Sequence, residues 1–257
     1  MVLWGALGFV VCWCVNVIAD CGPYAEPLAA PRCLNCGTPR ARAQWLGVVA
    51  YLSGQTRCRQ CHERITWRWP LVELVGIVLC AYLFFLFGLS LQLLLSTLYS
   101  ALLLLLCVID LEHCLILNRI IYPAIALSFA LSFVTPNLSP LSAIVGGLIG
   151  FAVTGLIYLG GKLFVRVQAR RGRALDEVAF GQGDVRLMLF IGLITGATGV
   201  GRALLLGVVL GGVAALGIIV FGLLRRESKL YVPYAYGPYL ALGGWVVLIQ
   251  NSVASSP

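Results

Sequence analysis

Long apolar stretches separated by short polar connections run through the whole chain. A helix needs roughly 20 mostly apolar residues to cross the hydrocarbon of a bilayer, and most of the stretches have about that length. The pattern predicts eight spans, near residues 2–19, 71–88, 91–109, 119–135, 141–163, 185–200, 203–223 and 237–253. Stretch 185–200 is short and contains glycine. If it did not span the membrane, the last two spans would run in the opposite direction.

Composition supports an all-α polytopic membrane protein. Apolar residues make up 60% of the 257 positions and charged residues only 11%, which is far from the balance of an average soluble domain. Residues 20–70 form the only sizeable polar segment. We therefore expect a first transmembrane helix over 1–19, a small cytoplasmic domain over 20–70, and a seven-helix membrane domain over 71–257.

Basic residues predict the orientation of the spans. With eight spans, residues 20–70, 110–118, 164–184 and 224–236 lie on one side and, with their borders, carry nearly all 18 Lys and Arg. Because basic connections stay in the cytoplasm, both chain termini are expected outside. The net charge of +8 is then a topology signal and does not call for a nucleic-acid partner. Four arginines could contact anionic lipid headgroups: Arg166, Arg170, Arg171 and Arg173.

Two Cys-x-x-Cys pairs stand in the polar segment, Cys33 with Cys36 and Cys58 with Cys61. This spacing favours one tetrahedral four-thiolate zinc site, which leaves no coordination position for water and is therefore structural. Disulfides or free thiols are the alternative, and a cytoplasmic location argues against disulfides. A segment this short buries little core of its own, so metal would supply much of its folding free energy.

Gly181-Gln182-Gly183-Asp184 opens the sixth predicted span and places a carboxylate at a membrane boundary. An ionised Asp there carries a desolvation cost, which makes Asp184 a functional candidate. Gly181 and Gly183 would allow an extended peptide or a neighbouring helix to approach the carboxylate closely. Helix packing alone is the alternative explanation for these glycines.

Asp110 ends the third predicted span on the same side of the membrane as Asp184. Two carboxylates brought together cannot both ionise easily, so they share a proton and can act as acid and base on a water molecule. The structural alternative is that Asp110 and Glu112 only neutralise Arg119 and Arg186. A further carboxylate, Glu73, enters the second span, and we expect a structural pairing with Arg64 or Arg68.

These features together resemble the type IV prepilin peptidases, the Gly-x-Gly-Asp aspartic proteases of bacterial inner membranes. The resemblance covers most of the chain: 8–16, the four cysteines, Ile65 to Glu73, Ile109 to His113, Gly181 to Met188, and Pro233 to Tyr239. The chain departs from the family pattern at Leu117, where a proline commonly stands.

The resemblance implies that Asp110 and Asp184 form the catalytic pair. It implies cleavage of the basic leader of prepilins or pseudopilins at the cytoplasmic face and, in many members, N-methylation of the new N-terminus with S-adenosylmethionine. The apolar helix of the substrate would lie between spans, with its leader extended across Gly181 and Gly183. The alternative is a non-catalytic zinc-stabilised transporter or assembly scaffold whose aspartates relay protons or bind cations.

Overall fold

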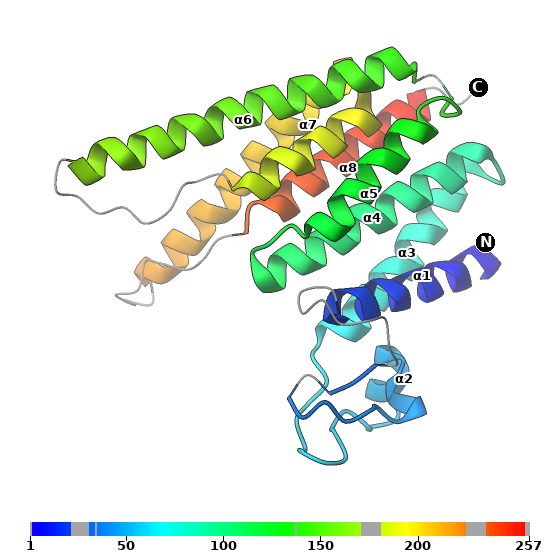
Figure 1. Cartoon of the computed structure of the whole chain (residues 1–257). Coiled ribbons are helices and arrows are strands. Elements are labelled where there is room, and N and C mark those ends of the chain that lie inside the picture. The colour runs from blue at the N-terminus through cyan, green and yellow to red at the C-terminus, as the bar shows by residue number, and fades with distance from the viewer. Residues whose placement is uncertain are drawn as a thin grey trace. The chain divides into compact units, whose positions relative to one another are not determined.

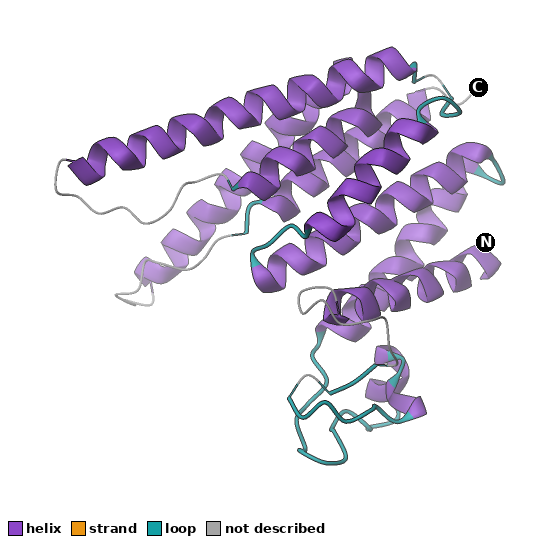
Figure 2. Cartoon of the chain, in the orientation of Figure 1, coloured by secondary structure: helices purple, strands orange, loops and turns teal. Residues whose placement is uncertain are grey.

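The computed structural model describes residues 2–21, 31–33, 35–136, 138–170, 181–224 and 235–254. Within these residues the regular structure is helical apart from two isolated β-bridges (Figure 2). The predicted all-α class is therefore confirmed. The chain divides into two compact units, Met1–Leu105 and Leu106–Pro257. Predicted positions 22–30, 171–180 and 225–234 lie outside the described residues.

The first unit contains two long apolar helices, α1 (Val2–Cys21) and α3 (Arg68–Phe87), which pack against each other (Figure 1). Gly8 and Gly76 allow this close approach, since a Cβ on Gly8 would lie 2.5 Å from the carbonyl oxygen of Gly76. Between them the chain forms the short helices η2 (Arg42–Gln44) and α2 (Gly47–Leu52). The unit ends within α4 (Leu91–His113).

The second unit begins with the last turns of α4 and continues with four helices (Figure 1). They are α5 (Asn118–Leu131), α6 (Pro140–Arg170), α7 (Gln182–Leu224) and α8 (Gly237–Ala254). Glycines bring α6 against α7, where Gly146, Gly147 and Gly150 face Gly192 and its neighbours. Small residues permit such close backbone contact, which drives helix association where no hydrophobic difference exists between protein and lipid.

Helix α7 is two arms joined at Gly196, whose φ of 73° only glycine adopts readily. The contacts with α8 show that the arms run in opposite directions. Gly244 of α8 faces Ile191 and Asn251 faces Thr195 in the first arm, whereas Gly207 and Gly211 of the second arm face Leu240 and Tyr236. The reversal corresponds to the predicted stretches 185–200 and 203–223.

Five of the described helices are long and apolar enough to cross a membrane by length and composition: α1, α3, α4, α6 and α7. Two of the eight predicted stretches fall outside this group. The stretch 119–135 forms only the 14-residue α5, because residues 132–136 turn. The stretch 237–253 forms α8, which is 18 residues long and less apolar because it carries polar residues at 250–252.

Candidate active site and metal centre

The four predicted cysteines of the first unit converge. The Sγ atoms of Cys33, Cys36, Cys58 and Cys61 all lie within 4.8 Å of one another, which fits a single ion in tetrahedral coordination. Cys33 approaches Cys61 at 3.5 Å and Cys36 approaches Cys58 at 3.6 Å, so each close contact joins the two pairs. The cluster could hold a metal ion.

The two Cys-x-x-Cys loops have the same backbone structure. In each, the N–H of the first cysteine donates to the carbonyl five residues later, from Cys33 to Thr38 and from Cys58 to Glu63. In each, the residue after the second cysteine has a left-handed φ and donates its N–H back to the first cysteine. This residue is Gly37 in one loop and His62 in the other. His62 is exposed and lies outside the thiol cluster.

Hydrogen bonds around the loops favour the thiolate, the form that binds metal, at Cys36 and Cys58, whereas desolvation and hydrogen bonds with the other thiols raise the pKa of Cys61 to about 12. A hydrogen bond from the side chain of Thr38, whose oxygen lies 3.2 Å from Cys36 Sγ, lowers the pKa of the Cys36 thiol to about 6. Backbone N–H groups of Cys61 and Gln60 lower the pKa of Cys58. A set of four sulfur ligands fits zinc well.

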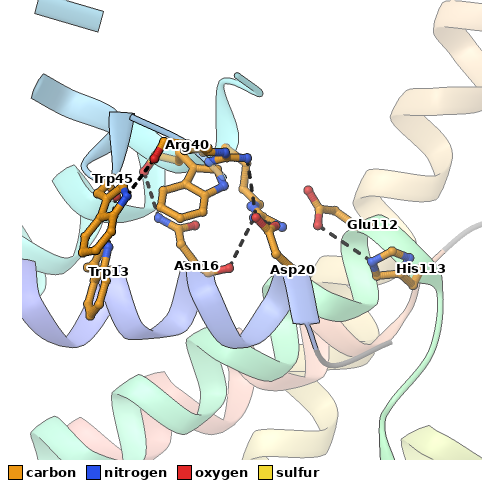
Figure 3. A network of polar contacts seen from close by, with 9 residues as sticks. Trp13, Asn16, Asp20, Arg40, Trp45, Glu112 and His113 are labelled. Carbon is orange, nitrogen blue, oxygen red and sulfur yellow. Dashed lines mark hydrogen bonds and ion pairs between the residues drawn. The ribbon is translucent and has the colours of Figure 1, made fainter. Parts of the chain in front are cut away.

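A buried polar network ties this loop region to α1 and α3 (Figure 3). The Asp20 carboxylate accepts a hydrogen bond from the Arg68 guanidinium and lies 3.6 Å from Arg40 Nη2. Asn16, which is fully buried, donates its amide to the Trp69 carbonyl at 3.1 Å. This polar side chain within α1 thus finds a partner inside the protein.

The expected pairing of Glu73 with an arginine is wrong. Glu73 is fully buried, and its two oxygens accept the backbone N–H groups of Gly47 and Val48, each at 2.8 Å. Both N–H groups lie in the first turn of α2, where backbone donors have no acceptor within their own helix. The carboxylate thus caps α2 from α3. The sequence did not reveal this because the cap lies 26 residues away from the donors.

Asp110 lies near the C-terminal end of α4, the end that the sequence predicts to face the cytoplasm. Its exposed fraction is 6%. Its Oδ2 accepts the backbone N–H of Gly237, the first residue of α8, at 3.0 Å. A Cβ on Gly237 would lie 3.0 Å from the Asp110 Cγ and closer still to Oδ2, so only glycine fits there. The start of a helix carries free N–H groups and positive potential, which stabilise an adjacent carboxylate.

Asp184 lies in the first turn of α7 and is 8% exposed. Its Oδ2 accepts the N–H of Gly181, the residue preceding the helix, at 2.8 Å. An acidic side chain that reaches back in this way from the third helical position is half of a capping box. Asp184, like Asp110, is therefore held by a backbone N–H at a helix start.

The two carboxylates belong to the second unit, and Asp110 lies within electrostatic range of Asp184. Burial and then the charge of Asp184 raise the pKa of the phenol of Tyr236, which precedes α8. The Tyr236 hydroxyl donates to the Val208 carbonyl at 3.3 Å, and its ring fills the space left by Gly211. The segment that opens α8 thus contacts both the Asp110 carboxylate and the second arm of α7.

The glycines around Asp184 have different surroundings. Gly181 is exposed, and a Cβ there would meet only Asp184 Oδ2 at an ordinary 3.6 Å. Gly183 faces Ile116, since a Cβ there would lie 2.9 Å from that side chain. Protein packing therefore requires glycine at 183, whereas at 181 the packing of the described residues leaves room for a side chain.

The structural alternative was that Asp110 neutralises Arg186, but Arg186 has other partners. Its Nη1 donates to the Asn118 side chain, and its guanidinium lies over the Tyr122 ring at 5.5 Å. Sequence reasoning located the aspartates but missed the donor at Gly237. The only signal was the Pro-Tyr-x-Tyr-Gly-Pro stretch before the last span, of which residues 233 and 234 lie outside the described part.

Fold and site define a multi-pass helical membrane protein with two buried aspartates in one unit and a four-cysteine cluster in the other. Two family models match successive parts of this chain. The model described as the bacterial peptidase A24 N-terminal domain matches residues 6–87, and the type IV leader peptidase family matches residues 97–216. The chain belongs to the type IV leader peptidase family.

Relatives of the chain carry the name prepilin leader peptidase/N-methyltransferase. The protein of Pseudomonas putida is 29% identical over 86% of this chain and 72% of its own length. That of Bacillus subtilis is 29% identical over 86% of this chain and 82% of its own length. That of Stutzerimonas stutzeri is 28% identical over 85% of this chain and 71% of its own length. The comparison with solved structures gave no match.

Proposed function

We propose that the chain is a membrane aspartic endopeptidase that removes the basic leader of prepilins or pseudopilins and then methylates the new N-terminus. The observation that carries the proposal is the pair Asp110 and Asp184, two buried carboxylates within electrostatic range of each other although 74 residues separate them. Family membership and the names of the relatives support the same activity.

The reaction would use one proton shared between the two carboxylates, because like charges at close range disfavour double ionisation. The ionised carboxylate takes a proton from water while the water oxygen attacks the scissile carbonyl, and the protonated one donates to the carbonyl oxygen. The C–N bond then breaks as the leaving nitrogen takes the proton that the first carboxylate received from water, and a hydroxyl of the tetrahedral intermediate returns its proton to the second carboxylate, so the pair regains its starting state.

The backbone N–H groups of Gly181 and Gly237 would keep the pair in position through these proton transfers. Each donates to one carboxylate oxygen, which leaves the other oxygen of that carboxylate for water or substrate. A backbone donor at a helix start does not rotate away as a side chain can. Pre-organised groups of this kind avoid reorganisation during the reaction.

The substrate is proposed to pass its leader across Gly181, whose exposure leaves backbone accessible for an extended peptide. Gly183 would contribute by seating Ile116 and so fixing the start of α7. We place this region at the cytoplasmic face of a bacterial inner membrane, because the arginine-rich connections flank the same helix ends.

The four cysteines are proposed to hold one structural zinc ion, with no position left open for catalysis. Zinc would hold together the small domain over 20–70, while the membrane domain over 71–257 carries both aspartates. Methylation would use S-adenosylmethionine, which when bound supplies an electrophilic methyl group to the new amino group. Anionic lipid headgroups are expected partners of Arg166 and Arg170. A nucleic-acid partner is not expected.

The experiment replaces Asp110 or Asp184 by Asn, which keeps the shape but cannot take a proton from water. We expect cleavage of a purified prepilin to fall to background, a loss of about 10⁴-fold or more, as for other essential acid–base groups. Glu112→Gln is the matched control and retains activity, since Glu112 lies two residues further on α4 and points elsewhere.

Near wild-type turnover in either aspartate variant would overturn the proposal. Insertion and folding are checked by detergent extraction and thermal unfolding, so that a lost activity is attributed to chemistry. If both variants fold and cation binding changes while the wild type cleaves nothing, the chain is a transporter or scaffold instead.

A further inference from the structure

Helix α2 turns apolar side chains outward. Its Gly47 and Ala50 face the protein and are buried. Val49 and Leu52 lie three residues apart on another side of the helix, where they are 40% and 85% exposed. A helix in contact with water shows polar residues on its outer side. The exposed side of α2 therefore favours an apolar environment.

The entry to α3 has the same character. Trp67, the residue before α3, is 74% exposed, and its ring lies against the Tyr51 ring of α2, with 4.4 Å between the ring centres. From Trp67 an exposed apolar stripe continues along α3 at helical spacing: Leu71, Leu74, Val75, Val78, Tyr82 and Phe85. Because α3 is long and apolar enough to cross a membrane, this stripe suits contact with lipid. The exposed side of α2 adjoins it through Tyr51 and Trp67.

The contacts of α2 also define its level along α3. A Cβ on Gly47 would lie 2.6 Å from the Pro70 nitrogen, and Glu73 accepts the N–H groups of Gly47 and Val48. Pro70 and Glu73 belong to the first two turns of α3, so α2 begins beside these turns (Figure 1). The apolar run of α3 begins at Leu71, between them. Helix α2 therefore lies at the level where hydrocarbon gives way to headgroups.

The loops around α2 carry an excess of positive charge. Among the described residues of 31–66, the exposed charged side chains are five arginines and one glutamate: Arg32, Arg42, Arg57, Arg59, Arg64 and Glu63. This excess suits a leaflet that contains anionic lipid. An exposed Trp, outward apolar side chains and nearby basic groups are together the features of a segment that lies on a membrane surface.

We propose that α2 and Trp67 form an interfacial anchor, which inserts Val49, Leu52 and Trp67 among the lipid headgroups beside α3. The partner is the bilayer surface, with anionic lipid close to the arginines. Because the Cys-x-x-Cys loops flank α2 in the chain, the anchor holds the cysteine cluster close to the membrane. The proposal concerns the first unit alone and does not depend on the peptidase activity.

The test is photo-crosslinking of the full, metal-loaded chain in nanodiscs that contain phosphatidylcholine and phosphatidylglycerol. Leu52→benzoylphenylalanine is compared with His62→benzoylphenylalanine, because both positions are exposed and His62 lies on the second Cys-x-x-Cys loop. On illumination the new side chain bonds to whatever C–H group it contacts. Mass spectrometry is expected to find lipid adducts on the Leu52 variant and only background on the His62 variant.

A second measurement uses Trp67→Phe, which keeps an aromatic ring against Tyr51. Tryptophan emission of the wild type is expected to be quenched by lipids brominated near the headgroup, and Trp67→Phe is expected to lose part of that quenching. Quenching that this variant leaves unchanged would overturn the anchor. So would an absence of adducts at Leu52, equal lipid yields at Leu52 and His62, or crosslinks from Leu52 to another part of the chain or to a second copy.

Discussion

The cysteine cluster and the aspartate pair gather reactive groups in opposite ways. The cysteines come from two loops with the same backbone hydrogen bonds, 25 residues apart, and each loop brings two ligands by these local bonds. The aspartates come from different helices, and each is held by one backbone N–H at a helix start. Local spacing can build the first site, whereas the second exists only after the membrane helices have packed.

Gly237→Ala is expected to have the largest effect on one site alone, because it should lower cleavage at the aspartates and leave the cysteine cluster unchanged. The added Cβ meets the Asp110 carboxylate, so the carboxylate must move away from the N–H that positions it. We expect cleavage to fall about 100-fold, the cost of a misplacement near 1 Å. Prepilin cleavage measures this, with metal content unchanged. Gly212→Ala in α7 is the control, because open space surrounds that position; equal activity in both variants would contradict the assignment.

Loss of the cysteine ligands should damage stability before chemistry. The Cys36→Ser, Cys58→Ser double variant is expected to lose the metal, about one zinc per wild-type chain, and to become protease-sensitive over 31–66. Cleavage of prepilin should fall only in part, because the aspartates lie in the other unit. Metal analysis and limited proteolysis measure this, beside Cys14→Ser as an exposed control. A metal-free wild type with full activity and unchanged resistance would refute it.

Glu73→Gln tests the cap that joins α3 to α2. The amide offers one oxygen to two N–H donors and turns a donor of its own toward the other. We expect the free energy of unfolding to fall by about 1–3 kcal/mol, the cost of an unsatisfied buried donor. Thermal unfolding of the metal-loaded chain measures this loss. An unchanged melting temperature would show that the carboxylate is not needed at this cap.

The smallest expected effect is a change in stability when the two Cys-x-x-Cys loops are compared directly. His62 and Gly37 occupy equivalent left-handed positions, with φ of 58° and 71°. His62→Gly should stabilise the first unit by about 1 kcal/mol and Gly37→Ala should destabilise it by a similar amount, because a Cβ disfavours this conformation. No atom lies within 4 Å of a Cβ on Gly37, so only backbone conformation changes. Opposite shifts in unfolding temperature confirm the repeat; shifts of the same sign contradict it.

The sequence predicted those parts of the structure that depend on near neighbours along the chain. Apolar length located the helices, and Cys-x-x-Cys spacing located the cluster. Membrane alternation also predicted that Asp110 and Asp184 lie at one level, and this stays a prediction. Contacts between distant backbones were not predictable. Neither the N–H of Gly237 nor the cap by Glu73 leaves a periodic pattern, because a backbone donor has no side chain to mark it.

The reversal at Gly196 has a consequence for the surrounding lipid. The first arm of α7, from Gln182 to Thr195, has 14 residues and is therefore about 21 Å long, whereas the hydrocarbon layer is about 30 Å thick. A short apolar segment is accommodated by a thinner bilayer or by a polar end drawn inward. If this arm crosses the bilayer, Asp184 at its start is expected to meet a locally thinned boundary, with water closer to the middle of the membrane.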